Sequence, residues 1–364
     1  MNPLSLRAAC FFACASLSPA AVADGLPFDF SPTANIQYDW AQVDSDRIAT
    51  EGEEGFRRAR LGFRLKDPGK RWQFVAEHDF ADRTPPDAYL ELRPRAGHSI
   101  RVGQFKQPFT LEDANSDKQT AFLEPSFVGS FIVSRRIGAE YARFGKHGTL
   151  NAAVFDQRLD GTSESRGASL RGTWLLHSDK TGAAHVGMSL SSESPRNERA
   201  SFSANPGTTF TTLKSVSTGA LADVDRLDRA AVEGVWLRRN WSLQGEAAQV
   251  VAHRGAGLAD FHGNASSALL TWSPTGAART YKRGIAAAPS ADDAMAWELA
   301  LRWSAIDLDD GAVAGGHAES LGFAATCYFN SNVRLIANIV RVDSARRGIH
   351  DDPLVVGTRI QYTY

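Results

Sequence analysis

Cysteine and long apolar runs are both scarce in this chain of 364 residues, and each scarcity excludes a class of protein. The chain has three cysteines. Cys10 and Cys14 lie in an N-terminal stretch that we expect to be removed, so Cys327 alone remains and no intrachain disulfide can form. After that stretch, no run approaches the roughly 18 apolar residues that a membrane-spanning helix needs. The sequence therefore excludes a disulfide-stabilised secreted domain and a helical inner-membrane protein.

An excess of charge of either sign is also missing. The 40 basic and 41 acidic residues give a formal net charge of −1. This balance favours neither a nucleic-acid-binding protein nor a protein with a strongly acidic surface. Any electrostatic function must therefore come from where the charges are placed, and we expect no nucleic-acid partner.

The N-terminal residues 1–23 have the features of a secretory signal peptide. Arg7 supplies the positive charge, residues 8–17 form a small apolar stretch, and residues 21–23, Ala-Val-Ala, fit the small-residue cleavage pattern. We expect export through this signal, and a single folded domain over residues 24–364.

Alternation of apolar with polar or small residues is the main pattern of the remaining chain. On the C-terminal segment, Val356, Ile360 and Tyr362 share one parity, and Arg359 and Gln361 share the other. This is the period of a β-strand whose two faces meet different environments. The same pattern recurs at 34–40, 61–65, 72–76, 88–92, 168–176, 232–236, 241–247, 297–303, 321–329 and 333–339. The sequence therefore predicts an all-β protein.

Connections of two lengths separate these segments. Turn residues stand at 67–70, 94–97, 145–148 and 330–332, whereas the long polar stretches around 197–223, 276–293 and 307–319 are predicted to be extracellular loops. Short turns at one end and long loops at the other are typical of a transmembrane antiparallel β-barrel, and about 16 strands fit this length. A soluble β-sandwich also alternates. However, tryptophans recur on the apolar parity near segment ends, as the aromatic girdles of a membrane barrel require.

A column of cations follows one predicted strand. The even positions from 58 to 66 include Arg58, Arg60, Arg64 and Lys66, while the odd positions from 59 to 65 are apolar. A lipid-facing Arg at mid-depth would cost about 2–4 kcal/mol, so we expect the cations to line the lumen. Such a column selects anions by replacing part of their hydration shell. Alternatively, it balances Glu77, Asp79 and Glu91 on the following segments, which would leave the pore nearly unselective.

Four further arginines share the polar parity of their strands and fit a basic wall: Arg101, Arg302, Arg334 and Arg359. Between Phe105 and Arg136, by contrast, the alternation breaks. Pro108 and Pro125 are incompatible with a central strand. In a barrel this segment could fold inward and narrow the lumen, its backbone satisfied by protein or pore water. The alternative is a plain surface loop.

Five blocks of the sequence stand out together: Phe-Arg-Arg-Ala-Arg-Leu at 56–61, Val-Gly-Gln-Phe-Lys-Gln-Pro-Phe at 102–109, Arg-Arg-Ile-Gly at 135–138, the segment 296–303 and Arg-Ile-Gln-Tyr at 359–362. These blocks resemble the phosphate-selective porin O and P family of Gram-negative outer membranes. Their order and spacing span most of the chain. The resemblance implies a 16-stranded barrel, usually a homotrimer, in which an inward-folded constriction loop and an arginine ladder guide phosphate or polyphosphate by diffusion.

By this resemblance, Arg58 and Arg60 belong to the arginine ladder and Lys106 lies at the constriction. The same constriction role extends to Lys118, Arg135 and Arg136. The anion-path candidates are Arg58, Arg60, Arg64, Arg101, Lys106, Lys118, Arg135 and Arg136. The chain departs from a lysine-dominated phosphate trap, because the same segment holds Glu112, Asp113, Asp117 and Glu124. Anion transport is therefore a firmer expectation than phosphate as the natural solute.

Motifs of catalysis and metal binding are missing from the sequence. It has no His-Glu-x-x-His, no paired cysteine motif and no Gly-x-Ser-x-Gly elbow. We therefore expect no enzyme activity, no cofactor and no metal, but an outer-membrane channel, in contact with lipid, through which small anions diffuse. Two alternatives stay open: a general, weakly selective porin, and a non-conducting structural or adhesive barrel.

Overall fold

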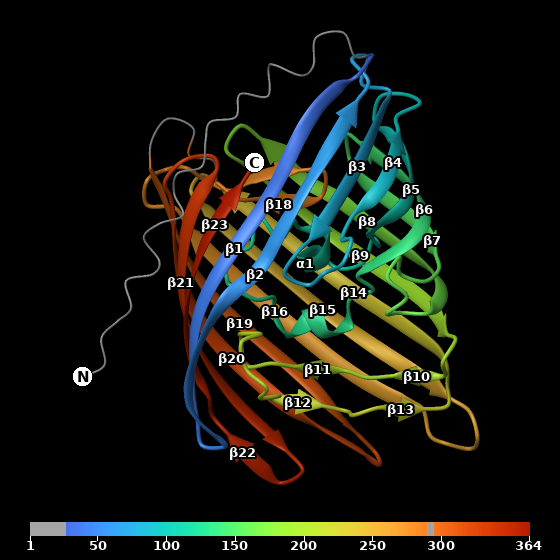
Figure 1. Ribbon diagram of the computed structural model, residues 1–364, viewed down its shortest axis with the longest axis vertical. Helices are drawn as coiled ribbons and strands as arrows, with labels where there is room; N and C mark the ends of the chain where they lie inside the picture. The colour runs from blue at the N-terminus through green and yellow to red at the C-terminus, as the bar shows by residue number, and fades with distance from the viewer. Residues whose placement is uncertain (1–26, 290, 292–294) are drawn as a thin grey trace.

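A computed structural model describes residues 27–289, 291 and 295–364 of the chain (Figure 1). The signal peptide expected at residues 1–23 lies outside the described residues. Within them, no helix is long and apolar enough to cross a membrane. Most of the described chain is instead β-strand, because its alternating sequence gives each strand one apolar and one polar face.

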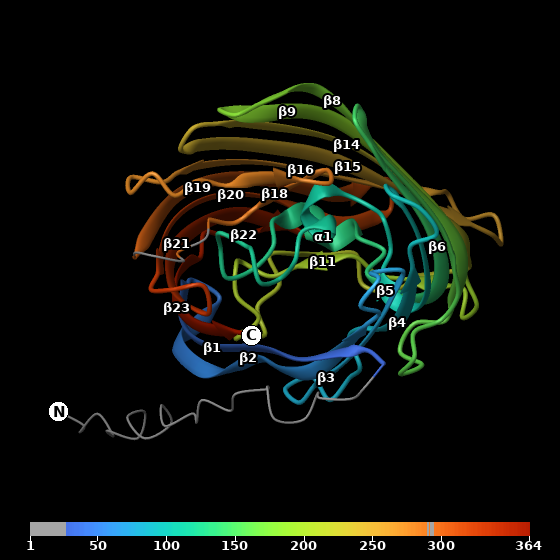
Figure 2. The same ribbon diagram turned by 90° about the horizontal axis from the view of Figure 1, so that it is seen from above.

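The strands form one closed antiparallel barrel, seen along its axis in Figure 2. Each strand pairs with its neighbours in the chain, and β1 pairs with β23 to close the ring. The expected antiparallel barrel of about 16 strands is confirmed. Its strands are β1 (Asp29–Ser45), β2 (Ile48–Lys66), β3 (Trp72–Asp79), β4 (Ala88–Leu92), β5 (His98–Lys106), β6 (Arg135–Gly145), β7 (Gly148–Phe155), β8 (Ser165–Asp179), β9 (Gly182–Pro195), β14 (Val224–Arg238), β15 (Trp241–Arg254), β16 (Phe261–Trp272), β19 (Ala296–Asp310), β20 (Val313–Tyr328), β21 (Val333–Arg346) and β23 (Leu354–Thr363).

Shorter elements lie in the connections. They are the strands β10 (Arg199–Ala200), β11 (Ser203–Ala204), β12 (Val216–Ser217), β13 (Leu221–Ala222), β17 (Thr280–Lys282), β18 (Ile285–Ala287) and β22 (Ile349–Asp351), the helix α1 (Leu111–Ala114) and the 3-10 helix η2 (Phe127–Phe131). Among these, β22 pairs with β21 just before β23 begins, so it extends the last strand of the wall.

The two faces of the wall follow the sequence alternation. On β19, Trp297, Leu301 and Trp303 point outward and are exposed, whereas Glu298 and Arg302 point inward and are buried. Lipid covers the outside of such a barrel, so exposed apolar side chains are favourable there. Tryptophans gather on this face toward one end of the barrel: Trp174, Trp236, Trp241, Trp272 and Trp297. They form one aromatic girdle, as expected.

The two ends of the barrel differ in their connections. We call the end with the short connections 67–71, 93–97, 146–147, 180–181, 239–240 and 329–332 the turn end, and the opposite end, which carries β10 to β13 and β22 and points down in Figure 1, the loop end. The stretch 197–223 lies at the loop end. The described part of the stretch 276–293, residues 276–289, does not, because it follows β16 at the turn end, so that expectation was wrong. The stretch 307–319 is mostly strand, with Gly311 and Ala312 in a tight turn between β19 and β20.

Residues 107–134, which we call the inner segment, leave the wall after β5 and lie inside the ring of strands (Figure 2). Their backbone donates hydrogen bonds to side chains of the far wall: Leu111 to Glu246 on β15 (3.0 Å), Phe127 to Ser304 on β19 (2.9 Å) and Leu123 to Asn338 on β21 (3.0 Å). A plain surface loop could not reach these inward-facing groups. The inner segment is therefore part of the barrel interior.

Apolar packing fixes the inner segment against the same wall. Phe127, Val128 and Phe131 belong to one buried apolar cluster that also includes inward-facing side chains of the wall. A glycine makes room for a further contact. A Cβ at Gly322 would lie 2.7 Å from the ring of Phe122. The close approach of this ring requires glycine, since real Cβ atoms do not tolerate such contacts.

Candidate functional site

A cavity of about 500 Å³ lies between the inner segment and the wall formed by β2 to β6. We call it the basic cavity, because nine of its lining residues are basic and five are acidic. The basic residues are Arg60, Arg64, Arg101, Lys106, Lys118, Arg135, Arg171, Lys282 and Arg283. The acidic residues are Glu77, Asp87, Asp113, Asp117 and Glu140. The formal excess of four positive charges contrasts with the net charge of −1 of the whole chain.

Six of the eight sequence candidates line the basic cavity: Arg60, Arg64, Arg101, Lys106, Lys118 and Arg135. The other two face the lumen outside its lining. Arg58 donates to Gln37 of β1 at 2.6 Å, and Arg136 lies 3.8 Å from Glu193 of β9. The alternation of charge on β2 thus placed its cations on the lumen side, as the column hypothesis requires.

A β-bulge adds one cation that the sequence pattern missed. The register between β1 and β2 shifts between Gln37 and Tyr38, so that Arg57 has no partner across the sheet. A bulge inserts one residue and changes which parity points inward. Arg57 accordingly points inward beside Arg58, and its guanidinium binds Glu124 of the inner segment at 2.7 Å. The adjacent cations Arg57 and Arg58 were the sequence signal for this bulge. Strict alternation, however, predicts that only one of two adjacent residues points inward.

Asp117 of the inner segment stands among four cations of the near wall. Its Oδ2 lies 2.6 Å from Arg60, 3.4 Å from Arg58 and 3.8 Å from Arg135, and its Oδ1 lies 3.0 Å from Lys106. Burial raises the pKa of a carboxyl, but the surrounding cations, Lys106 first, hold the pKa of Asp117 well below its usual range. This carboxylate therefore stays ionised.

Other carboxylates compensate most of these cations. Asp79 binds Arg60 at 2.8 Å, which agrees with the interpretation that acids of the following strands balance the column. Arg101 lies between Glu140 at 3.5 Å and Glu91 at 3.9 Å. Lumen ion pairs therefore account for much of the column, and they reduce the charge that a solute would meet.

Four cations of the basic cavity are left without a carboxylate within 4 Å in the described part of the chain: Arg64, Lys118, Lys282 and Arg283. The Lys118 Nζ lies 3.4 Å from the backbone oxygen of Ala34. The Arg283 guanidinium lies over the ring of Phe144, 4.6 Å from its centroid. Burial, together with Arg64 and Arg60, lowers the pKa of Lys118, while Glu77 opposes this shift. These four groups are the cations most available to a solute.

Three of the four arginines expected on a basic wall, Arg302, Arg334 and Arg359, face inward but do not line the cavity. Arg302 donates to the backbone oxygen of Glu124 at 2.8 Å, and Arg334 to that of Thr120 at 2.9 Å. Arg359 is fully buried and pairs with Asp39 at 2.6 Å. These arginines hold the inner segment and the wall together. Their partners were not predicted, because sequence parity shows the direction of a side chain but not what it contacts.

A second connection reaches the basic cavity from the turn end. Residues 273–289, the turn-end segment, carry Lys282 and Arg283 to the cavity lining. Arg279 binds Glu298 at 2.7 Å and anchors this segment to β19. On the other side, Arg171 of β8 donates to the backbone oxygen of Gly284 at 2.7 Å. This contribution was not predicted from the sequence, because the segment was expected at the opposite end of the barrel.

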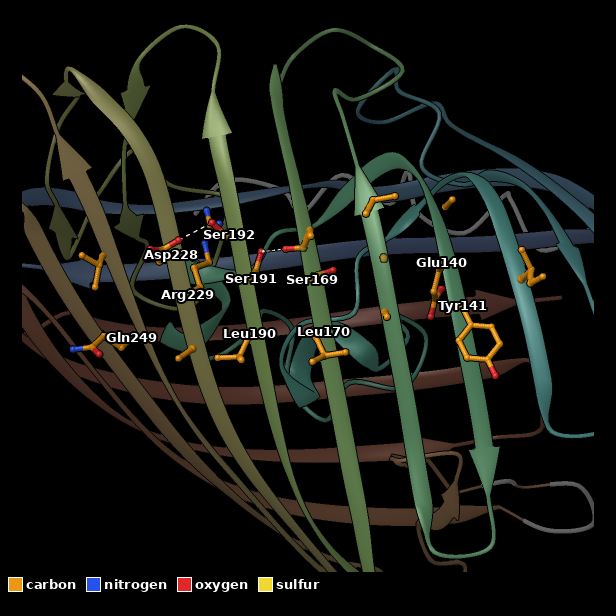
Figure 3. A pocket seen from close by; sticks show the side chains of 18 residues that line it. Glu140, Tyr141, Ser169, Leu170, Leu190, Ser191, Ser192, Asp228, Arg229 and Gln249 are labelled. Atoms are coloured by element: carbon orange, nitrogen blue, oxygen red, sulfur yellow. Dashed lines mark hydrogen bonds between the residues drawn. The ribbon is translucent and has the colours of Figure 1, made fainter.

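A second hollow, of about 910 Å³, is not part of this site. It is lined mainly by outward side chains of β6 to β9, β14 and β15, among them Tyr141, Leu170 and Leu190 (Figure 3). Ser192 and Asp228, joined by a hydrogen bond of 2.7 Å, lie at its polar edge. An apolar hollow on this face belongs to the lipid-facing surface.

Groups for metal binding are not gathered anywhere in the described residues. No three His, Cys, Asp or Glu side chains there could hold a metal ion together. The clusters that do form are ion pairs between arginine or lysine and carboxylates. Their chemistry is that of charge-assisted hydrogen bonds, which suit oxyanions and other small anions.

Comparison with solved structures finds the same fold in several outer-membrane proteins. OmpT of Vibrio cholerae is 12% identical, with a TM-score of 0.62 over 95% of this chain and 100% of that chain. An anion-selective porin from Comamonas acidovorans is 13% identical, with a TM-score of 0.61 over 93% and 100%. The channel DcaP of Acinetobacter baumannii is 12% identical, with a TM-score of 0.60 over 93% and 97%. At these identities the similarity shows the fold alone.

Sequence comparison identifies the family. None of the curated protein sequences matches the chain. The model of the family described as phosphate-selective porin O and P matches residues 30–364, which is almost all of the described barrel. The resemblance seen in the five sequence blocks is thereby confirmed. The chain belongs to the phosphate-selective porin O and P family and is an outer-membrane porin.

Proposed function

We propose that this porin is a passive diffusion channel for small anions, with phosphate-like oxyanions among its solutes. The observation that carries the proposal is the basic cavity, whose lining has four more basic than acidic residues in a chain that is slightly acidic overall. A ring or ladder of cations lowers the energy of an anion and raises that of a cation. The cavity therefore favours anions wherever a solute passes it.

The candidate residues divide into two roles. Arg64, Lys118, Lys282 and Arg283 have no carboxylate within 4 Å in the described residues and are proposed to attract the anion. Arg58, Arg60, Arg101, Lys106, Arg135 and Arg136 form ion pairs and are proposed to shape the narrowest part of the path together with the inner segment. The inner segment thereby serves as a constriction loop.

A weakly selective porin is the second candidate function, and a specific observation favours it. Every acid of the basic cavity except Glu77 lies within 4 Å of a cation. Paired charges attract a passing ion much less than free ones, because the two fields cancel within a few ångströms. The four cations without such a partner then decide between strong and weak selectivity.

The zero-current potential of the purified full chain in a planar bilayer under a potassium chloride gradient tests the proposal. An anion channel gives the sign that corresponds to chloride permeation, and phosphate then inhibits the chloride current. A potential of the opposite sign, or one near zero, contradicts anion selectivity. A non-conducting bilayer would instead favour a structural or adhesive barrel.

Assembly and export complete the proposal. One of the solved OmpT structures of similar fold is described as a trimer form, and we propose a homotrimer here, with the exposed apolar wall meeting outer-membrane lipid. We also propose export through the signal peptide at residues 1–23. No cofactor or catalytic step is part of the mechanism, since diffusion through a charged cavity needs neither.

A further inference from the structure

The four cations around Asp117 converge on one point of the near wall. They come from three places in the chain: Arg58 and Arg60 from β2, Lys106 from the end of β5, and Arg135 from the start of β6. Both carboxylate oxygens of Asp117 are engaged, Oδ1 by Lys106 at 3.0 Å and Oδ2 by Arg60 at 2.6 Å. Such a set of converging donors is the arrangement that binds a free oxyanion.

Three of these four cations have a second carboxylate. Asp79 lies 2.8 Å from Arg60, Asp113 lies 3.4 Å from Lys106, and Asp87 lies 2.9 Å from Arg135. Without Asp117, four cations would therefore face three carboxylates.

Arg58 is the cation that depends on Asp117. Its Nη1 donates to the neutral Gln37 at 2.6 Å. Its Nε is buried and has no hydrogen-bond partner among the described residues, although Asp117 Oδ2 lies 3.4 Å away. A donor in this state is available to an oxygen placed slightly closer.

We propose that Asp117 is a tethered counter-ion that occupies an oxyanion site of the channel wall and thereby sets its affinity for phosphate-like solutes. This inference rests on the proposed anion path. The backbone holds the carboxylate in place, because Gln37 donates to the backbone oxygen of Asp117 at 3.1 Å and Lys106 donates to that of Asn115 at 3.1 Å. A solute thus meets a site already filled by the protein's own anion. It binds weakly and passes on instead of being trapped.

The depressed pKa of Asp117 agrees with this role, because a protonated acid could not act as a counter-ion. The inference also explains why the inner segment contains acidic residues, which a simple phosphate trap would lack. Asp117 and Glu124 each neutralise arginines of β2, so the inner segment screens the column that faces it. The cations without carboxylate partners are then left to attract the solute.

Substitution Asp117→Asn tests the inference, because it removes the charge and keeps the shape. In planar bilayers, the concentration of inorganic phosphate that halves the chloride current should fall about tenfold or more, the effect of gaining one or two charge-assisted hydrogen bonds. Asp117→Glu keeps the charge and should resemble the unmodified protein. Asp156→Asn is the matched control, since Asp156 pairs with Arg196 at 2.8 Å and both are exposed.

Equal phosphate inhibition of Asp117→Asn and the unmodified protein would overturn the inference. If Asp117→Asn does not fold into a heat-resistant barrel, Asp117→Ser provides the same comparison with a smaller side chain. The proposed function fails separately, when the unmodified protein shows no preference for chloride over potassium. The inference is decided only by the difference in phosphate inhibition between the variant and the unmodified protein.

Discussion

Substitution Arg64→Gln should lower anion selectivity without lowering the stability of the barrel. Arg64 lines the basic cavity and has no carboxylate within 4 Å in the described residues. An anion passing ~5 Å from its charge gains ~0.8 kcal/mol in a medium with the dielectric constant of water. At ~0.1 M salt, where the Debye length is ~10 Å, this falls to ~0.5 kcal/mol, about a twofold gain in anion occupancy.

A cation is repelled by the same amount, so the effects on the two ions multiply. The ratio of chloride to potassium permeability should therefore fall by about fivefold at ~0.1 M salt, and by more at lower salt. The zero-current potential under a potassium chloride gradient measures this ratio. The difference between the variant and the unmodified protein should shrink as the salt concentration rises, because screening weakens every exposed charge.

Arg60→Gln provides the contrast, because it removes the same charge from a different setting. Arg60 is buried between Asp79 and Asp117. Its loss leaves the buried carboxylate of Asp79 without its cation partner, and breaking such a pair costs about 3–5 kcal/mol. We therefore expect Arg60→Gln to lower the temperature at which the barrel unfolds in detergent, whereas Arg64→Gln does not. Arg341→Gln is the control for general effects, since Arg341 is exposed on the outer face and pairs with Asp352.

An unchanged permeability ratio in Arg64→Gln would refute this reasoning. In that case the cations with carboxylate partners, and not those without, would set the selectivity. A loss of selectivity in Arg341→Gln would be equally damaging, because it would mean that charge acts regardless of its position.

Three further predictions concern the inner segment and its surroundings. The pKa of Lys118 lies below its ordinary value of 10.5, so its positive charge is lost at a lower pH than that of a free lysine. Anion selectivity should therefore fall as the pH rises through the pKa of Lys118, which zero-current potentials at increasing pH measure. Lys118→Arg should abolish this change. Gly322→Val should displace Phe122 and lower stability by about 1–3 kcal/mol in detergent melts, whereas Gly234→Val, where a Cβ meets only one backbone oxygen at 4.0 Å, should have little effect. Arg359→Gln should lower stability by about 3–5 kcal/mol in the same melts, because it leaves Asp39 buried without its partner; an unchanged melting temperature would contradict the structural role of this pair.

The sequence predicted the wall well and the connections poorly. Alternation on β19 and β23 is a local property, and it correctly separated outward tryptophans from inward Glu298, Arg302 and Arg359. The length and polarity of a single connection do not show at which end of the barrel it lies. The stretch 276–293 was therefore predicted at the wrong end of the barrel. The end at which a connection lies depends on the direction in which its flanking strands cross the wall.

The candidate cations were easier to locate than their partners. Parity showed that Arg60 and Arg334 face inward, because a charged side chain avoids lipid. It could not show that Arg60 binds a carboxylate 57 residues away, or that Arg334 holds the backbone of Thr120. Such contacts depend on how the barrel closes and on where the inner segment lies inside it. Arg57 was missed for a different reason, since a single bulge changes the inward parity.

The near-neutral charge of the chain and its basic cavity have a common explanation. Acids of the inner segment and of the wall neutralise the arginines that hold the interior together, as Glu124 does for Arg57 and Asp39 does for Arg359. The arginines that build the fold therefore cannot also supply the field that a solute meets. That field comes from the difference between the cations and the carboxylates of the interior. Here the difference is a few cations beside the inner segment. It follows that selectivity should respond strongly to a change of one charge at Arg64 or Asp117, and hardly at all to the total charge of the chain.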